Sequence, residues 1–127
     1  MNKNILIIGS SGLVGSQSSN YFATRGFNVI GVSRNVSKIN DKIKYLNTDY
    51  SELEVLTLLN LELDHILFCA SDQTQFMQYG QINFNIEMEK LKFQNLLEVS
   101  CQLPTLKSFI FISSYLQQEL YTNLIKL

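Results

Sequence analysis

Short apolar runs alternate with segments of helical periodicity along the chain. Residues 4–8 (NILII) form one such run directly before Gly9, and residues 27–32 (FNVIGV) form a second. A short run that is apolar throughout, without polar alternation, is typical of a strand buried on both faces of a parallel sheet. The pattern predicts three further strands, at residues 43–46, 64–70 and 107–113.

Four helices are predicted between and after these strands. The first covers residues 12–25 and ends at Gly26. The second covers residues 51–61, because Ser51 and Glu54 have the spacing of a capping box. The other two helices are predicted at residues 83–101 and 115–127.

The helix predicted at residues 83–101 has two apolar rows, which is more than packing against one face of a sheet would bury. The first row comprises Phe84, Met88, Leu91 and Val99, and the second comprises Phe93 and Leu97. The charged residues Glu87, Glu89 and Lys90 are predicted to form a solvated face of this helix.

Strands that alternate with helices predict βαβ units with right-handed crossovers. The expected fold is α/β: a Rossmann-like, doubly wound parallel sheet of about five strands in the order 3-2-1-4-5, with helices on both faces. Ligands bind such sheets at the carboxyl ends of the first and fourth strands, where the strand order reverses. A length of 127 residues fits a single domain spanning residues 1–127.

Composition excludes several classes of function. Hydrophobic residues make up 46% of the chain and charged residues 17%, with a formal net charge of −1, as in an ordinary soluble globular domain. Nucleic acid is not an expected partner, because phosphate binding needs clustered Lys and Arg.

No stretch approaches the ~20 apolar residues of a membrane helix or has the form of a signal peptide, so we expect a cytoplasmic protein without membrane contact. Cys69 and Cys101 lack a C-x-x-C spacing and are expected to be free thiols.

Three glycines follow the first predicted strand, in the sequence IIGSSGLVGS at residues 7–16. Gly9 is expected to permit a sharp turn from strand to helix, because it has no Cβ. Gly12 begins the helix, where free N–H groups and the helix dipole can bind a pyrophosphate. Gly15 allows close approach of the helix to the sheet. Small polar neighbours able to hydrogen-bond phosphate are Ser10, Ser11 and Ser16. The alternative is a tight strand–helix turn that binds nothing.

The loop and the segments after it resemble the short-chain dehydrogenase/reductase superfamily. The resemblance is greatest to its extended branch, the NAD-dependent epimerase/dehydratase family, which acts on nucleotide sugars. The loop has the spacing G-x-x-G-x-x-G, FNVIGVSR matches the family's second strand, and FIFISS at residues 109–114 matches the fifth. NLLEV at residues 95–99 matches a long helix in which the family commonly has N-L-L-E-A. The resemblance covers residues 3–114, which is about the first half of a typical family member.

This resemblance implies a dinucleotide site. Asp49, in NTD at residues 47–49, corresponds to an acidic position that meets adenine, although it could also be a solvated turn residue. Ala70, in ILFCAS at residues 66–71, corresponds to a residue that lies along the cofactor. The expected cofactor-binding residues are Gly9, Ser10, Ser11, Gly12, Leu13, Val14, Gly15, Ser33, Arg34, Asp49, Tyr50, Ala70 and Ser71.

The end of the second strand favours NADP(H) over NAD(H). A carboxylate at this position binds the two ribose hydroxyls of NAD, but this chain has Ser33 there, followed by Arg34. The planar guanidinium of Arg34 suits a 2′-phosphate. The alternative is that Arg34 and nearby Lys38 are solvated loop residues.

The catalytic groups of the resembled family are not complete in this sequence. That family uses a Tyr-x-x-x-Lys pair beyond the fifth strand to move a proton while hydride passes to or from nicotinamide. Neither Tyr115 nor Tyr121 has a lysine four positions later. Ser114 falls where the family has a catalytic Ser or Thr, but we favour the alternative that it is a strand-end residue capping the last helix. The only histidine, His65, is expected to be structural, and no metal-ligating cluster stands out.

The expected function is a dinucleotide-binding domain that resembles the cofactor half of a nucleotide-sugar epimerase/dehydratase and is catalytically incomplete alone. Two alternatives remain open. One is a non-catalytic binding or assembly protein that kept the fold, and the other is a reductase completed by another chain. The sequence names no substrate.

A homodimer is also expected. The strand at residues 107–113 would be an apolar sheet edge, which invites pairing with another chain. The surplus apolar row of the helix at residues 83–101 is a second candidate contact. Four leucines form one row of the predicted last helix: Leu116, Leu120, Leu124 and Leu127.

Overall fold

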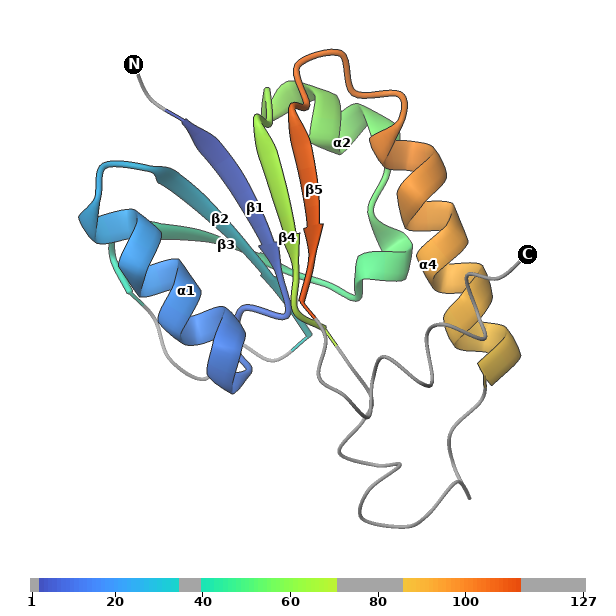
Figure 1. Ribbon diagram of the computed structural model, residues 1–127, viewed down its shortest axis with the longest axis horizontal. Helices are drawn as coiled ribbons and strands as arrows, with labels where there is room; N and C mark the ends of the chain where they lie inside the picture. The colour runs from blue at the N-terminus through green and yellow to red at the C-terminus, as the bar shows by residue number, and fades with distance from the viewer. Residues whose placement is uncertain (1–2, 35–39, 71–85, 113–127) are drawn as a thin grey trace, which may run out of the picture.

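Five parallel strands form one sheet in the order β3-β2-β1-β4-β5, with helices on both of its faces (Figure 1). The computed structural model describes residues 3–34, 40–70 and 86–112. The strands are β1 (Asn4–Ile8), β2 (Asn28–Ser33), β3 (Ile43–Asn47), β4 (His65–Phe68) and β5 (Ser108–Phe111). The helical elements are α1 (Leu13–Thr24), the 3₁₀ turn η1 (Tyr50–Glu52), α2 (Val55–Asn60) and α4 (Ile86–Ser100). The fold class and the strand order predicted from the sequence are confirmed.

The two faces of the sheet bury separate apolar clusters. Side chains alternate along a strand, so Ile5 and Ile7 of β1 join the cluster that includes Phe22 of α1. Leu6 and Ile8 join the larger cluster on the face covered by α2 and α4. The continuous apolar runs of the sequence are therefore explained by burial on both sides.

An aromatic group holds α4 and η1 against the sheet. The Phe68 ring lies at its centre and is 1% exposed. Ring centroids of Tyr50, Phe93 and Phe111 lie 5.1, 5.3 and 5.4 Å from that of Phe68. Since these rings come from η1, α4, β4 and β5, one cluster fixes four elements that are distant in sequence.

The strand register brings three loop starts together. Ile8 of β1 pairs with Val32 of β2 on one side and with Phe68 of β4 on the other. Because the strands are parallel, their carboxyl ends meet at one edge of the sheet. Gly9, Ser33 and the residues after Phe68 consequently share this edge.

Helix α1 begins and ends close to its predicted limits. Gly12 is its N-cap and Arg25 its C-cap. Gly26 follows with a φ of 85°, a left-handed conformation that glycine adopts without a steric penalty. The prediction that Gly26 ends the helix is confirmed.

The predicted helix at residues 51–61 is wrong in its first half. A 3₁₀ turn occupies Tyr50–Glu52, and α2 begins only at Val55. Ser51 is not a cap: its own backbone N–H is capped by the Asp49 carboxylate. The break lets Tyr50 and Leu53 both reach the core, where they are 7% and 6% exposed.

The apolar rows of α4 also differ from the prediction. The buried row is Phe93, Leu96 and Val99, whereas Met88 and Leu91 are 53% and 60% exposed. The reason is the helical period: the buried row follows one face of α4, and Leu91 lies about 200° around the helix from Phe93.

Glu89 is buried, at only 6% exposed, in contrast to the solvated face that the sequence predicts for it. Glu87, two residues earlier, is exposed as expected, and Lys90 is half-buried.

Parts of several predicted elements lie outside the described residues. These are residues 83–85 of the long helix, the end of the fifth predicted strand at residue 113, and the last helix at residues 115–127. Within the described part, β5 ends at Phe111, which pairs with Phe68 of β4.

Candidate functional site

Gly9 makes the turn that separates β1 from α1. Its φ is 87°, and its N–H donates to the Val32 carbonyl at 2.9 Å, as does the Ser10 N–H at 3.1 Å. A Cβ at Gly9 would lie 2.7 Å from the Ala70 backbone nitrogen. Conformation and space therefore both require glycine here.

Gly15 is required by packing alone. A Cβ at this position would lie 1.9 Å from the Gly9 carbonyl oxygen and 3.0 Å from the Ser10 Cα. The close approach that Gly15 allows is thus between α1 and the loop before it. Gly9 and Gly15 together explain the compact turn without any ligand.

Gly12 is different, because the fold does not require glycine there. Its φ of −74° and ψ of 173° suit any residue, and an added Cβ would meet only the Gly9 carbonyl oxygen, at an ordinary 3.5 Å. The residue is exposed at the start of α1, where Leu13 and Val14 are 76% and 47% exposed. The first-turn N–H groups of a helix lack acceptors within the helix. The open face at Gly12 therefore has the form of an anion site.

The two loop serines point in different directions. Ser10 is 4% exposed, and its Oγ fills the space left by Gly31, where a Cβ would be 2.7 Å away. The Ser10 Oγ has no hydrogen-bond partner among the described residues. Its hydroxyl consequently lies away from the open side of the loop, in contrast to the expected contact with phosphate.

Ser11 links the loop to the end of β2. The Ser33 hydroxyl donates to the Ser11 Oγ at 2.7 Å. Ser33 is buried and Arg34 is exposed. The pair of hydroxyls lies where the sequence places the ribose end of a dinucleotide, and Arg34 adds a positive charge beside it.

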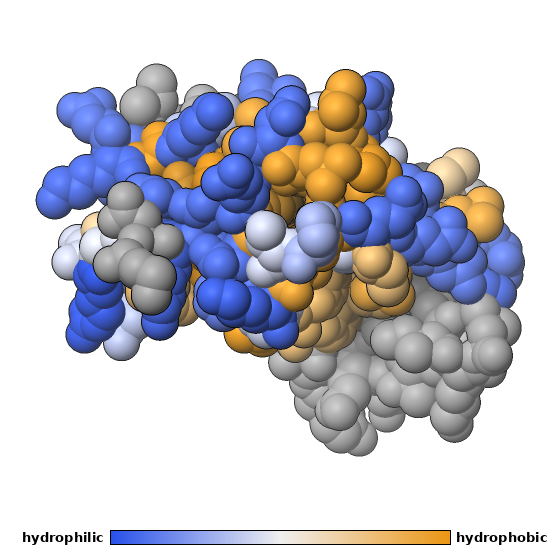
Figure 2. Space-filling view, turned by 90° about the horizontal axis from the view of Figure 1, so that it is seen from above, coloured by the Kyte–Doolittle hydropathy of each residue, from blue (hydrophilic) through white to orange (hydrophobic). Residues whose placement is uncertain are grey.

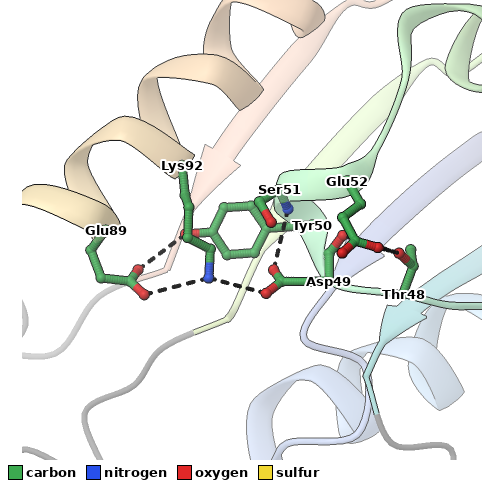
Figure 3. Close-up of polar contacts among 7 residues, drawn as sticks. All are labelled: Thr48, Asp49, Tyr50, Ser51, Glu52, Glu89 and Lys92. Carbon is green, nitrogen blue, oxygen red and sulfur yellow. Dashed lines mark hydrogen bonds and ion pairs between the residues drawn. The ribbon is translucent and has the colours of Figure 1, made fainter. Parts of the chain in front are cut away.

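Asp49 follows β3 and has both carboxylate oxygens engaged (Figure 3). Its Oδ1 accepts the Ser51 N–H at 3.2 Å, and its Oδ2 lies 3.2 Å from the Nζ of Lys92 on α4. Burial alone would raise the pKa of this carboxyl, but the Ser51 N–H and Lys92, with a smaller effect of Arg34, hold the pKa below its ordinary value. Asp49 is therefore an ionised acceptor at neutral pH.

Lys92 and Glu89 were missed as site residues. The Tyr50 hydroxyl donates to Glu89 Oε2 at 3.1 Å, and Lys92 Nζ lies 3.6 Å from Glu89 Oε1. The Glu89–Lys92 pair has the local i,i+3 spacing, but no local sequence pattern could have found the contacts of these residues with Tyr50 and Asp49, which are 39 and 43 residues away from Glu89 and Lys92.

Cys69 and Ala70 continue from β4 beside the glycine loop. The Cys69 N–H donates to the Ile8 carbonyl at 2.8 Å. Burial raises the pKa of the Cys69 thiol to about 11, so it stays protonated and is a poor nucleophile. Cys69 and Cys101 are both free, as predicted.

The other residues considered from the sequence do not lie at the described part of the glycine loop. Ser71 and Ser114 fall outside the described residues. His65 lies at the amino end of β4, where its Nδ1 is 2.6 Å from the Ser108 Oγ of β5. This contact joins two strands at the edge of the sheet opposite the glycine loop.

The described residues contain no cluster of three or more His, Cys, Asp or Glu side chains that could hold a metal ion. They also contain no helix long and apolar enough to cross a membrane.

The sheet order and the glycine loop define a Rossmann-like α/β protein. A model of the NAD dependent epimerase/dehydratase family matches residues 5–123. The chain belongs to this family, as its motifs predicted. No curated protein matches the chain in sequence.

Solved structures share the fold at low sequence identity. UDP-glucose 4-epimerase from Thermotoga maritima, solved with UDP-glucose, is 19% identical, with a TM-score of 0.71 over 87% of this chain and 38% of that chain. An epimerase from the methanogen Methanothermobacter thermautotrophicus is 20% identical, with a TM-score of 0.72 over 90% of this chain and 36% of that chain. The Bordetella bronchiseptica enzyme WbmH, solved in complex with NAD+, is 15% identical, with a TM-score of 0.63 over 79% of this chain and 35% of that chain. The chain therefore aligns with less than half the length of each of these relatives.

Proposed function

We propose that this chain is the dinucleotide-binding domain of an epimerase/dehydratase, with the cofactor pyrophosphate bound at Gly12 and the N-terminus of α1. The observation that carries the proposal is the open face of Gly12, a glycine that the fold itself does not need. A bound pyrophosphate explains this glycine, because any side chain would occupy the anion's place. Family membership and the NAD+ complex of WbmH support a nicotinamide dinucleotide.

The other expected site residues receive roles in the same proposal. Asp49 accepts a hydrogen bond from adenine, Tyr50 packs beside it, and Ala70 lies along the cofactor. Gly9, Gly15 and Ser10 shape the loop, while Leu13 and Val14 present the first-turn N–H groups. Ser71 completes the set. The whole of residues 1–127 acts as one domain.

Thermal protection tests the proposal. A ligand that binds only the native state raises the free energy of unfolding by about 2.7 kcal/mol when it is present at a hundredfold excess over its Kd. We expect NADPH or NADH to shift the unfolding midpoint accordingly. Equal midpoints with and without both dinucleotides at millimolar concentration would refute the proposal.

We further propose that the site prefers NADP(H), because Arg34 stands beside the Ser11–Ser33 pair and no carboxylate is present at Ser33. Arg34→Ala should weaken NADPH binding about tenfold or more, as for loss of a charge-assisted hydrogen bond, and barely change NADH binding. Calorimetric titration with both cofactors measures this. Arg25→Ala at the far end of α1 is the matched control, and a wild-type preference for NADH would contradict the assignment.

The chain by itself is proposed not to run the family's reaction. Bound NADP(H) or NAD(H) supplies hydride transfer, but a positioned acid–base pair must move the proton. The sequence has six tyrosines, and none has a lysine four positions later. Incubation of the 127-residue chain with cofactor and UDP-glucose should therefore give no epimer or oxidised sugar.

We also propose a cytoplasmic homodimer. The two free cysteines suit a reducing compartment. Met88 and Leu91 leave an apolar strip exposed on α4, and Figure 2 shows exposed apolar groups among polar ones on the molecular surface. A second copy can cover this strip by pairing α4 with α4. Light scattering should give twice the 14.6 kDa chain mass for the wild type and the mass of one chain for Leu91→Glu. A wild-type monomer at high micromolar concentration would refute the dimer.

A further inference from the structure

Lys92 lies between two carboxylates and an aromatic face (Figure 3). Its Nζ is 3.2 Å from Asp49 Oδ2, 3.6 Å from Glu89 Oε1 and 4.7 Å from the centroid of the Tyr50 ring. Its side chain is only 15% exposed. A lysine at a protein surface ordinarily samples many rotamers, so these contacts restrict an otherwise flexible side chain.

The groups that restrain Lys92 are themselves anchored in the core. Tyr50 packs edge-on against the buried ring of Phe68, with centroids 5.1 Å apart. Glu89 is 6% exposed and accepts the Tyr50 hydroxyl at 3.1 Å. Figure 3 shows Glu89 on one side of the ammonium and Asp49 on the other. The ammonium is thus held from the core side and presents its charge to Asp49.

Asp49 is fixed in turn. Lys92 engages one oxygen and the Ser51 N–H engages the other, which leaves further lone pairs on both oxygens. An ionised carboxylate only accepts hydrogen bonds. It attracts the 6-amino group of adenine and repels the 6-oxo group of hypoxanthine. Such selection is sharp only if the carboxylate is held in one orientation.

We propose that Lys92 is a positioning residue that holds the Asp49 carboxylate so that the site selects 6-amino over 6-oxo purine dinucleotides. This inference rests on the proposed function, because it assumes that Asp49 meets the base. Lys92 lies on α4, so this helix would contribute to base selection in addition to the glycine loop.

Base selectivity is measured by a ratio of dissociation constants. The full chain is titrated with NADP+ and with nicotinamide hypoxanthine dinucleotide phosphate, and the experiment is repeated with the corresponding pair that lacks the 2′-phosphate. The two members of a pair differ at position 6 of the purine, which is amino in one and oxo in the other, and at the adjacent N1, which carries a hydrogen only in the 6-oxo form. Wild-type protein should bind the deaminated analogue about tenfold more weakly, as for loss of one hydrogen bond to a charged group. A structural defect weakens both ligands alike and leaves this ratio unchanged.

Lys92→Met keeps the apolar stem over Tyr50 and removes the charge, so the ratio should fall to about twofold or less. Lys92→Arg should retain the ratio, because it retains the ion pair. Lys90→Met is the matched control: it lies two positions away on α4, about 200° around the helix, and should leave the ratio unchanged. If Lys92→Met does not fold, the double variant Glu89→Gln/Lys92→Met is used in its place, because it also removes the buried carboxylate that has lost its ion-pair partner.

The outcomes separate the two proposals. A wild-type ratio in folded Lys92→Met, or a ratio near one in the wild type, overturns the role of Lys92 and leaves dinucleotide binding intact. Failure of both Lys92→Met and Glu89→Gln/Lys92→Met to fold also overturns the role of Lys92 in base selection, because Lys92 would then support the fold. Absence of binding by all four dinucleotides overturns the proposed function and this inference with it.

Discussion

Replacing Gly12 with valine should abolish dinucleotide binding and leave the fold nearly intact. The open face of Gly12 admits a side chain without a clash in the free protein, since an added Cβ meets only one backbone oxygen at 3.5 Å. With a dinucleotide bound, the same side chain would occupy the place of the pyrophosphate at the helix N-terminus. We expect Kd to rise by about a hundredfold or more, and the free energy of unfolding to fall by about 1 kcal/mol or less, as for a poorer N-cap.

Calorimetry and urea unfolding measure the two effects separately. Gln17→Val is a matched control, because it places the same side chain at an exposed position of α1 beyond the first turn. It should bind NADPH and NADH as the wild type does. An unchanged Kd in folded Gly12→Val would remove Gly12 from the site.

Gly15→Ala should have the opposite effect and damage the fold. Its Cβ would lie 1.9 Å from the Gly9 carbonyl oxygen and 2.7 Å from the Gly9 carbonyl carbon. These are backbone atoms, so α1 must move away from the loop as a whole. We expect the free energy of unfolding to fall by roughly 3 kcal/mol or more, because backbone overlap cannot be relieved by a rotamer change.

Gly12→Ala is the matched control for Gly15→Ala. Both substitutions add one methyl group in the same loop, but only Gly15 faces backbone atoms at short range. Gly12→Ala should cost about 1 kcal/mol or less in urea unfolding. Similar losses for the two variants would contradict the assignment of packing to Gly15 and of binding space to Gly12.

The sheet could be predicted because its signals are local. Each run such as NILII or FNVIGV is apolar throughout, and the turn residues around it mark its ends. Handedness and connection rules then leave a small number of strand orders, of which 3-2-1-4-5 is one of the two common ones. Strand ends remained uncertain by one or two residues, because hydrogen-bond pairing with a neighbour decides where a strand stops.

The break between η1 and α2 could not be predicted in this way. Ser51 and Glu54 have the spacing of a capping box, and the local pattern favours a continuous helix. Burial of Tyr50 and Leu53 under α4 overrides that pattern. Tertiary packing of residues far apart in sequence therefore decided the local structure.

The candidate site was only partly visible in the sequence for the same reason. The loop glycines have a fixed spacing, so their positions were predictable. The buried orientation of the Ser10 hydroxyl depends on the space beside Gly31, and the ion pair of Asp49 depends on Lys92 of α4. Both are contacts between distant segments, and spacing carries no information about them.

The most direct test of the glycine loop as a dinucleotide site is an NMR titration of the ¹⁵N-labelled chain with NADPH and NADH. We expect the largest amide shift changes at Gly12, Leu13 and Val14, with smaller changes at Ser33 and Asp49. Saturable binding that leaves the amides of Gly12, Leu13 and Val14 unmoved, or no spectral change with either dinucleotide, would contradict a dinucleotide site at this loop.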